Sequence, residues 1–156
     1  MNGEDEPVDR KNPYWDQRQR NLSINTNGET LTINEIKFVE RFLNYGESIE
    51  WIARTTKPTA DFVWITNGGI ECEVKSTKAK YSTIRNQIVP DVAKARERNV
   101  EQRKRFFVVD IGSVRLTAKL RSQLEQYNLR NPRNQISRLW IMHSDGMLDE
   151  IMLRTM

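Results

Sequence analysis

Apolar residues change their spacing several times along the chain, and each spacing predicts a different element. Between Ile36 and Leu43 they recur every three or four residues, the period of a helix that packs on one side. The segment Thr32-Ile33-Asn34-Glu35 before them has the Thr-x-x-Glu form of a capping box. We therefore expect a helix that opens at Thr32 and ends at Gly46.

Three short runs with strand character follow this predicted helix, over residues 48–54, 61–66 and 70–75. The second and third runs are joined by Asn67-Gly68-Gly69. A short loop of Asn and Gly between two strands indicates a β-hairpin. We expect these two strands to pair side by side.

The second half of the chain alternates between helical and strand patterns. Apolar residues between Tyr81 and Ala95 follow the helical period, and Pro90 is expected to kink or restart that helix. The next run is continuously apolar, which is typical of a strand buried on both faces. This strand, a third helix and the two strands of a closing hairpin are expected over residues 106–111, 117–127, 138–143 and 147–153.

The order of these elements predicts one α/β domain with a mixed sheet, because helices and strands alternate instead of forming separate blocks. Residues 1–21 are polar, hold two of the five prolines and show no apolar period. We expect a flexible arm there and the domain in residues 22–156. A small hairpin turn is expected at Asn27-Gly28.

Composition excludes several kinds of site. The chain has one Cys and one His, so it cannot build a Cys/His zinc cluster, a disulfide framework or a Cys-x-x-Cys redox pair. No apolar run approaches the roughly 20 residues that span a bilayer, and the first residues do not resemble a signal peptide. We expect a soluble chain with no membrane partner, with Cys72 in the core and His143 in a structural role.

Charge is distributed unevenly along the chain. The 25 basic and 21 acidic residues give a net charge of +4, but residues 1–10 are acidic, whereas residues 71–105 and 115–138 each carry an excess of basic residues. Such an excess suits nucleic acid as a partner, although solvated helix faces would explain it equally well.

The run 70–75 carries the residues with the clearest chemical potential. A strand's period of two puts three charged side chains on one face, Glu71, Glu73 and Lys75. The opposite face carries Ile70, Cys72 and Val74. The predicted hairpin can bring Asp61 alongside Glu73. Two carboxylates with a lysine suit Mg²⁺ or Mn²⁺ and a phosphate, while a salt bridge on an exposed face and a strand-opening Asp61 are the structural alternatives.

Together these features resemble the PD-(D/E)XK nuclease superfamily, whose core has the order αβββαβ. The resemblance covers residues 31–111 and rests on Asp61, the eleven residues after it, and Glu73-x-Lys75, with Ala60 where the family usually has Pro. It implies a restriction-endonuclease-like αβββαβ core with a mixed central sheet, to which the chain adds a C-terminal helix and β-hairpin. It also implies metal-dependent phosphodiester cleavage, with Asp61 and Glu73 holding Mg²⁺ or Mn²⁺ and Lys75 as the catalytic lysine.

The family often completes its site with an acidic residue on the first helix. Glu35 matches that residue as a third metal ligand, and Glu40, farther along the same helix, is the substitute. A capping box explains Glu35 without any metal, so both interpretations stay open.

Basic residues after the run 70–75 are candidates for contacts with substrate phosphates. They are Lys78, Lys80, Arg85, Arg96, Arg98, Arg103, Lys104 and Arg105, with Arg115, Lys119, Arg121, Arg130 and Arg133 farther along. Few aromatic residues interleave with them, which favours a structured substrate such as a tRNA over a single strand.

Within the superfamily, the short chain and its Glu-Val-Lys-Ser run are most similar to the C-terminal toxin domains of contact-dependent inhibition and related polymorphic toxin systems, several of which cleave tRNA. This resemblance implies a toxin domain that acts in the cytoplasm, delivered there as part of a secreted chain, with a cognate immunity protein as partner. Two alternatives stay open. One is a DNase of restriction or repair type, and the other is a noncatalytic basic module that binds nucleic acid.

Overall fold

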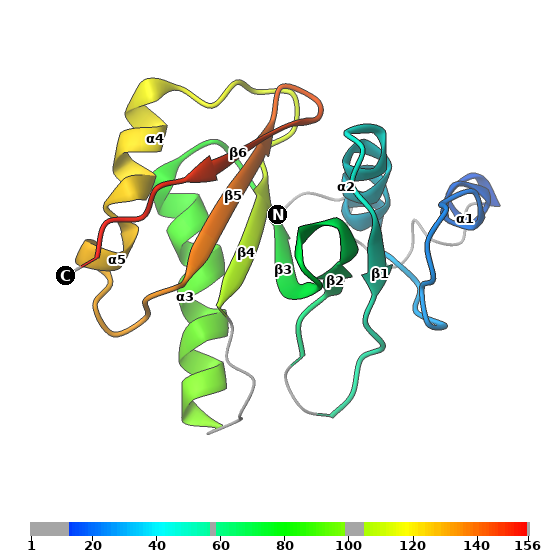
Figure 1. The fold of residues 1–156 in the computed structure, drawn as a ribbon, viewed down its shortest axis with the longest axis horizontal. Helices are drawn as coiled ribbons and strands as arrows, with labels where there is room; N and C mark the ends of the chain where they lie inside the picture. The colour runs from blue at the N-terminus through cyan, green and yellow to red at the C-terminus, as the bar shows by residue number, and fades with distance from the viewer. Residues whose placement is uncertain (1–12, 57–58, 99–104, 156) are drawn as a thin grey trace.

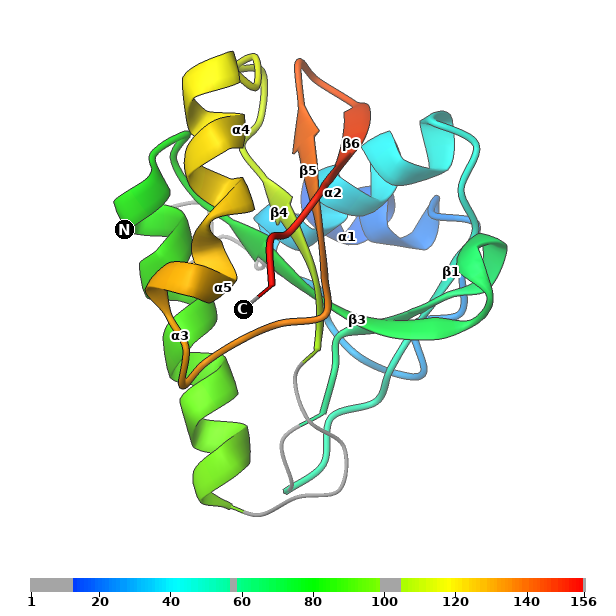
Figure 2. The same cartoon turned by 60° about the vertical axis from the view of Figure 1, so that its left-hand side comes forward.

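The computed structural model describes residues 13–56, 59–98 and 105–155. Its centre is one six-stranded sheet with the strands in chain order, and helices cover both faces (Figures 1 and 2). The strands are β1 (Ile49–Trp51), β2 (Phe62–Trp64), β3 (Ile70–Ser76), β4 (Phe106–Asp110), β5 (Arg138–His143) and β6 (Met147–Ile151). The helices are α1 (Pro13–Arg20), α2 (Ile33–Asn44), the short 3-10 helix η3 (Ile65–Asn67), α3 (Tyr81–Glu97), α4 (Ala118–Glu125) and α5 (Tyr127–Arg130).

The sheet is mixed, as predicted. Strands β1, β2 and β3 form an antiparallel meander, β3 and β4 are parallel across α3, β4 and β5 are parallel across α4 and α5, and β5 and β6 form an antiparallel hairpin. From α2 to β4 the order is αβββαβ, and helices and a β-hairpin follow. The predicted fold class is therefore confirmed.

Helix α2 begins as its sequence predicts. The Glu35 backbone N–H donates to the Thr32 hydroxyl at 3.1 Å, and the Thr32 N–H donates to the Glu35 carboxylate at 2.9 Å. These two bonds satisfy N–H groups that a helix start otherwise leaves without partners. The helix then buries Ile36, Val39 and Phe42 against the sheet.

Two apolar cores lie on the two faces of the sheet. The first lies beneath α2 and is rich in aromatic residues, with Phe42 and Trp64 centroids 4.8 Å apart and Trp64 4.8 Å from Trp140. The second lies beneath α3, α4 and α5. Strand β4 serves both cores, since Val108 belongs to the first and Phe107 to the second, which confirms the predicted strand buried on both faces.

Some local predictions differ from the structure. Residues 13–20, within the expected arm, form α1, which the apolar pattern did not predict because none of its residues is buried. Trp15 of α1 is partly buried against the first core, and polar contacts add to that packing. The Arg18 guanidinium lies 4.4 Å from the Trp15 ring centroid and pairs with Glu40 of α2.

Helix α3 continues through Pro90, so of the two expected outcomes, a kink or a restart, the restart does not occur. Both Pro90 and Asn86, whose carbonyl loses its helical partner, are exposed, so water can satisfy that carbonyl. The expected third helix is divided at Gln126 into α4 and α5. At Asn27-Gly28 the backbone turns with φ of 52° and 80°, but no strands flank it, so the hairpin expected there is absent from this described segment.

A buried ion pair ties α2 to the end of β4. Asp110 is 4% exposed, pairs with the Arg41 guanidinium and accepts the Gly112 N–H at 2.8 Å. Burial raises the pKa of the Asp110 carboxyl, and the nearby Arg41 charge opposes that rise. The carboxylate therefore depends on Arg41 at neutral pH.

Replacing Arg41 with Met should destabilise the fold, because the Asp110 carboxylate would lose its positive partner. We expect the free energy of unfolding to fall by about 3 kcal/mol at pH 7. The pKa of Asp110 lies above its ordinary value of 3.8, so the folded protein binds this proton more tightly than the unfolded chain does. The charged carboxyl therefore lowers the free energy of unfolding increasingly as pH rises above 3.8. The deficit of the variant should therefore shrink toward pH 4, as measured by urea unfolding.

The matched control is Arg121→Met, which removes a partner of Asp149 in a pair whose side chains are 39% and 37% exposed. That change should cost under about 1 kcal/mol. Equal losses in the two variants would contradict a structural role for the Arg41–Asp110 pair.

Candidate active site

Strand β3 has an apolar face and a charged face, as its alternation predicts. Cys72 and Val74 are buried in the core beneath α2. Glu73 and Lys75 point to the opposite face, where Glu73 is 7% exposed and its Oε1 lies 3.8 Å from the Lys75 ammonium nitrogen. Two charged groups are thus enclosed at the middle of the sheet, and buried charges require partners.

Asp61 lies next to this pair. The β2–β3 register pairs Phe62 with Cys72, so the residue one step earlier, Asp61, faces Glu73. Its carboxylate also accepts the Val74 backbone N–H at 2.9 Å, and its own N–H donates to the Cys72 carbonyl at 2.9 Å. These bonds fix the Asp61 carboxylate at the point where β2 begins, beside the charged face of β3.

Asp91 of α3 is a member of the cluster that sequence reasoning missed. Its Oδ2 lies 2.6 Å from the Lys75 ammonium nitrogen. Burial lowers the pKa of Lys75, but Asp91, Glu73 and Asp61 together outweigh burial, so the pKa of Lys75 is raised. The signal was in the sequence, because Asp91 is three residues after Ile88 and four before Ala95, on the buried stripe of the helix.

Glu35 lies near Asp61 but is already bonded. One oxygen accepts the Thr32 N–H, and the other lies 3.2 Å from the Arg54 guanidinium. Burial raises the pKa of the Glu35 carboxyl, and the Asp61 charge adds to that rise, so the two carboxylates lie close enough to interact. No signal in the sequence pointed to Arg54. In the structure its guanidinium supplies the positive charge next to Glu35.

Glu40, the substitute for Glu35, is placed elsewhere. Its carboxylate pairs with Arg18 and holds α1 against α2. The structure therefore gives Glu40 a part in the docking of α1.

The carboxylates of the site meet the needs of a divalent ion only as a pair. Among residues 13–56, 59–98 and 105–155, no group of three or more His, Cys, Asp and Glu side chains is arranged to hold a metal. Mg²⁺ is usually held by only one or two carboxylates, with waters and substrate phosphates completing the shell. Asp61 and Glu73 fit that requirement as a pair, and Glu35 could join them only by giving up its contact with Arg54.

The basic residues expected to meet phosphate do not form one continuous surface. Lys78 and Lys80 precede α3 and are exposed, while Arg98 and Arg105 lie at the other end of the βαβ unit formed by β3, α3 and β4. Arg103 and Lys104 lie outside the described residues.

Two further arginines of α3 are engaged with the segment after α5. The Arg85 Nε donates to the Asn131 side chain at 2.9 Å, and Arg96 donates to the Asn134 side chain at 2.7 Å. These contacts help to fasten α3 to the loop before β5. These two arginines on the outer side of α3 therefore have a structural role.

His143 has structural contacts, as expected. Its Nδ1 accepts the Leu116 N–H at 3.2 Å, and its Nε2 lies 2.5 Å from Asp149. The Ser144 hydroxyl is 3.1 Å from Nδ1, so His143 contacts both a serine and an aspartate side chain. However, the N–H groups of residues 144, 145 and 146 are all bonded to backbone carbonyls, which leaves none of these three to stabilise an oxyanion.

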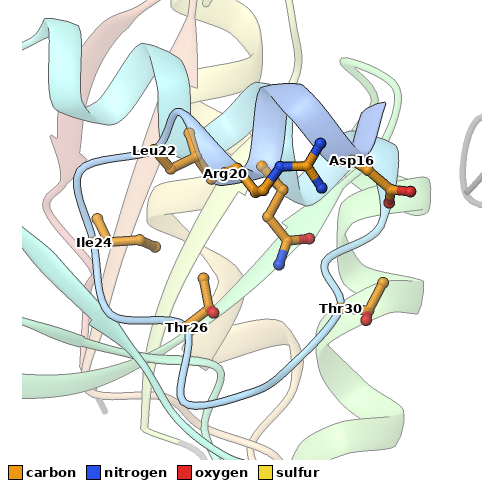
Figure 3. Close-up of a pocket in the computed structure, with 7 residues that line it drawn as sticks. Asp16, Arg20, Leu22, Ile24, Thr26 and Thr30 are labelled. Atoms are coloured by element: carbon orange, nitrogen blue, oxygen red, sulfur yellow. The ribbon is translucent and has the colours of Figure 1, made fainter. Parts of the chain in front are cut away.

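A pocket of about 290 Å³ lies between α1 and the loop that follows it (Figure 3). It is lined by Asp16, Gln19, Arg20, Leu22, Ile24, Thr26 and Thr30. None of the predicted site residues belongs to this lining. The pocket is thus separate from the charged face of β3, where the carboxylates and lysine gather.

No protein-family profile matches the sequence, and no curated protein matches it. Its fold is similar to that of a chain of the CdiA-CT/CdiI toxin and immunity complex from Burkholderia pseudomallei, with a TM-score of 0.54 and 13% sequence identity. The match covers 76% of this chain and 82% of that chain. At this identity the likeness is one of fold. Separately, no helix in the described part of the chain is long and apolar enough to cross a membrane.

Two substitutions at Glu35 separate its capping role from any role in binding. In Glu35→Gln the amide oxygen can still accept the Thr32 N–H, so we expect the free energy of unfolding to stay within about 0.5 kcal/mol of wild type. Glu35→Ala removes the bond and should cost about 1 kcal/mol. Urea unfolding measures both, and equal losses would contradict the capping role.

Proposed function

We propose that the protein is a metal-dependent nuclease whose site comprises Asp61, Glu73 and Lys75, and that it serves as a toxin domain. The observation that best supports this proposal is that two carboxylates and a lysine, Asp61, Glu73 and Lys75, meet on one face of the sheet. The surrounding elements have the order αβββαβ. The fold likeness to a chain from a toxin and immunity complex supports the toxin part of the proposal.

The charged groups of the site have distinct tasks in this proposal. Asp61 and Glu73 would hold the divalent ion, Mg²⁺ or Mn²⁺, with Glu35 as a third ligand once Arg54 moves away. When bound, such an ion polarises the scissile phosphate and lowers the pKa of a water molecule. Asp61 is suited to this work because its hydrogen bond to the Val74 N–H fixes the carboxylate beside the charged face of β3.

Lys75 would act on the substrate as a fixed positive charge. Its raised pKa keeps the ammonium protonated at neutral pH, so it can stabilise the negative charge that develops on phosphorus and orient the attacking water. Its side chain is 20% exposed, so part of it remains accessible to a substrate although α3 covers this face of the sheet.

Nucleic acid is the proposed substrate, and tRNA is favoured over DNA. Arg54 is 55% exposed beside Glu35, and Arg98 and Arg105 are exposed at the end of the βαβ unit where α3 finishes and β4 begins. Cations that approach a phosphate backbone supply affinity that falls with salt and does not depend on sequence. Selection of tRNA would then come from its shape.

A cleavage assay tests the enzyme proposal. Purified protein with Mg²⁺ or Mn²⁺ is offered total tRNA and plasmid DNA, beside Asp61→Asn, Glu73→Gln and Lys75→Met. We expect metal-dependent cleavage of tRNA that falls at least about a hundredfold in each variant, because each loses a group that acts on the reacting phosphate. Circular dichroism confirms that the variants fold.

The matched controls make the same change of carboxylate to amide at exposed residues outside the site, in Asp145→Asn and Glu150→Gln. These variants should cleave at the wild-type rate. Cleavage that survives all three site substitutions would refute the assignment of the site. Digestion of plasmid alone would select the DNase, and salt-dependent binding without cleavage would select the noncatalytic module.

A growth experiment tests the toxin proposal. Induced expression of the wild-type chain in a bacterial cytoplasm should stop growth, because uncontrolled cleavage of tRNA removes a substrate of translation. Asp61→Asn should permit growth at an equal protein level, and co-expression of a cognate immunity protein should restore it for the wild type. Normal growth with soluble, active wild-type nuclease would exclude a toxin role and leave the enzyme proposal in place.

A further inference from the structure

We propose that Asp91 is a positioning residue, whose carboxylate holds the Lys75 ammonium over the sheet face that carries Asp61 and Glu73. The inference rests on the proposed function, in which Lys75 acts on the substrate. It adds a residue of α3 to a site otherwise built from the start of β2, from β3 and from the start of α2, the elements labelled in Figure 1.

The distances show which carboxylate controls the lysine. The Lys75 ammonium nitrogen is 2.6 Å from Asp91 and 3.8 Å from Glu73, so the closer partner comes from the helix and not from its own strand. A lysine side chain has four methylene groups and an ammonium with three donors, which many conformers can satisfy. An ion pair with a carboxylate on a second element reduces that freedom and holds the ammonium near α3.

Asp91 is well suited to that task because α3 fixes its backbone. Ile88 and Ala95, on the same stripe of the helix, are 0% and 1% exposed, and Ile88 belongs to the second core. The Asp91 side chain is short, with few rotatable bonds, and is 26% exposed. The packing of α3 therefore determines where the carboxylate lies, and the carboxylate in turn determines where the ammonium lies.

A purely stabilising role explains this arrangement poorly. The position of Asp91, on the buried stripe of α3, would suit an apolar residue. An enclosed ion pair is often no more stabilising than well-packed apolar side chains of similar size. The chain nevertheless places an Asp there, opposite the one lysine of β3 and near two further carboxylates. A functional reason to hold the lysine accounts for that choice.

Steady-state cleavage of tRNA tests the inference in the 156-residue chain. Asp91→Asn and Asp91→Ala should lower kcat on the order of tenfold to a hundredfold, because a misplaced group can cost about that much, and KM should stay within about twofold. Asp91→Glu restores the charge and should recover part of kcat. Glu97→Gln, the same change of carboxylate to amide at an exposed residue of α3, should have no effect.

A second measurement does not require activity. In a ¹⁵N spectrum of lysine ammonium groups, a held Lys75 should give a signal that exchanges slowly with water, assigned by its absence in Lys75→Met. The signal should be lost in Asp91→Ala and kept in Glu97→Gln. Persistence of the signal in Asp91→Ala would overturn the inference, as would full activity of both Asp91→Asn and Asp91→Ala.

These outcomes distinguish the two proposals. A wild-type protein that cleaves neither RNA nor DNA refutes the proposed function, while an Asp91-dependent Lys75 signal in that protein still shows that Asp91 holds the lysine. Wild-type cleavage with a Lys75 signal unchanged in Asp91→Ala keeps the nuclease and removes Asp91 from its site.

Discussion

The enclosed charge on β3 is the constraint on which the rest of the site depends. A strand in the middle of a sheet has both faces covered, so Glu73 and Lys75 must find partners there. Those partners come from two directions, Asp61 from the neighbouring strand and Asp91 from the covering helix. The same strand buries Cys72 and Val74 in the aromatic core, so the packing of one face fixes the geometry of the other.

Much of the fold could be predicted because its signals are local. The capping box of Thr32 and Glu35, the apolar run of β4 and the turn before β6 each specify an element within a few residues. Helix α1 could not be predicted, since a helix with no buried residue leaves no apolar period in the sequence. Its contacts, from Arg18 to Glu40, join distant residues, and a single sequence does not reveal such pairs.

The site was predictable to the extent that it follows from strand alternation and a hairpin. The register of β2 and β3 places Asp61 opposite Glu73, as the spacing predicted. The role of Asp91 could not be predicted, because a carboxylate on an apolar stripe is visible in the sequence but its partner on another element is not. Arg54 was expected within a strand over residues 48–54, but β1 ends at Trp51, so Arg54 lies in the loop after it and meets Glu35 there.

The contacts that build the site differ in sequence separation from those that close the fold. Asp61 and Val74 are 13 residues apart, whereas Arg41 and Asp110 are 69 apart. Closing the longer loop costs about 1.5 kcal/mol more in chain entropy. Joining β2 to β3 therefore has a lower entropic cost than joining α2 to the end of β4. The carboxylate pair of Asp61 and Glu73 depends on a local hairpin, whereas the ion pair of Arg41 and Asp110 requires most of the sheet between them.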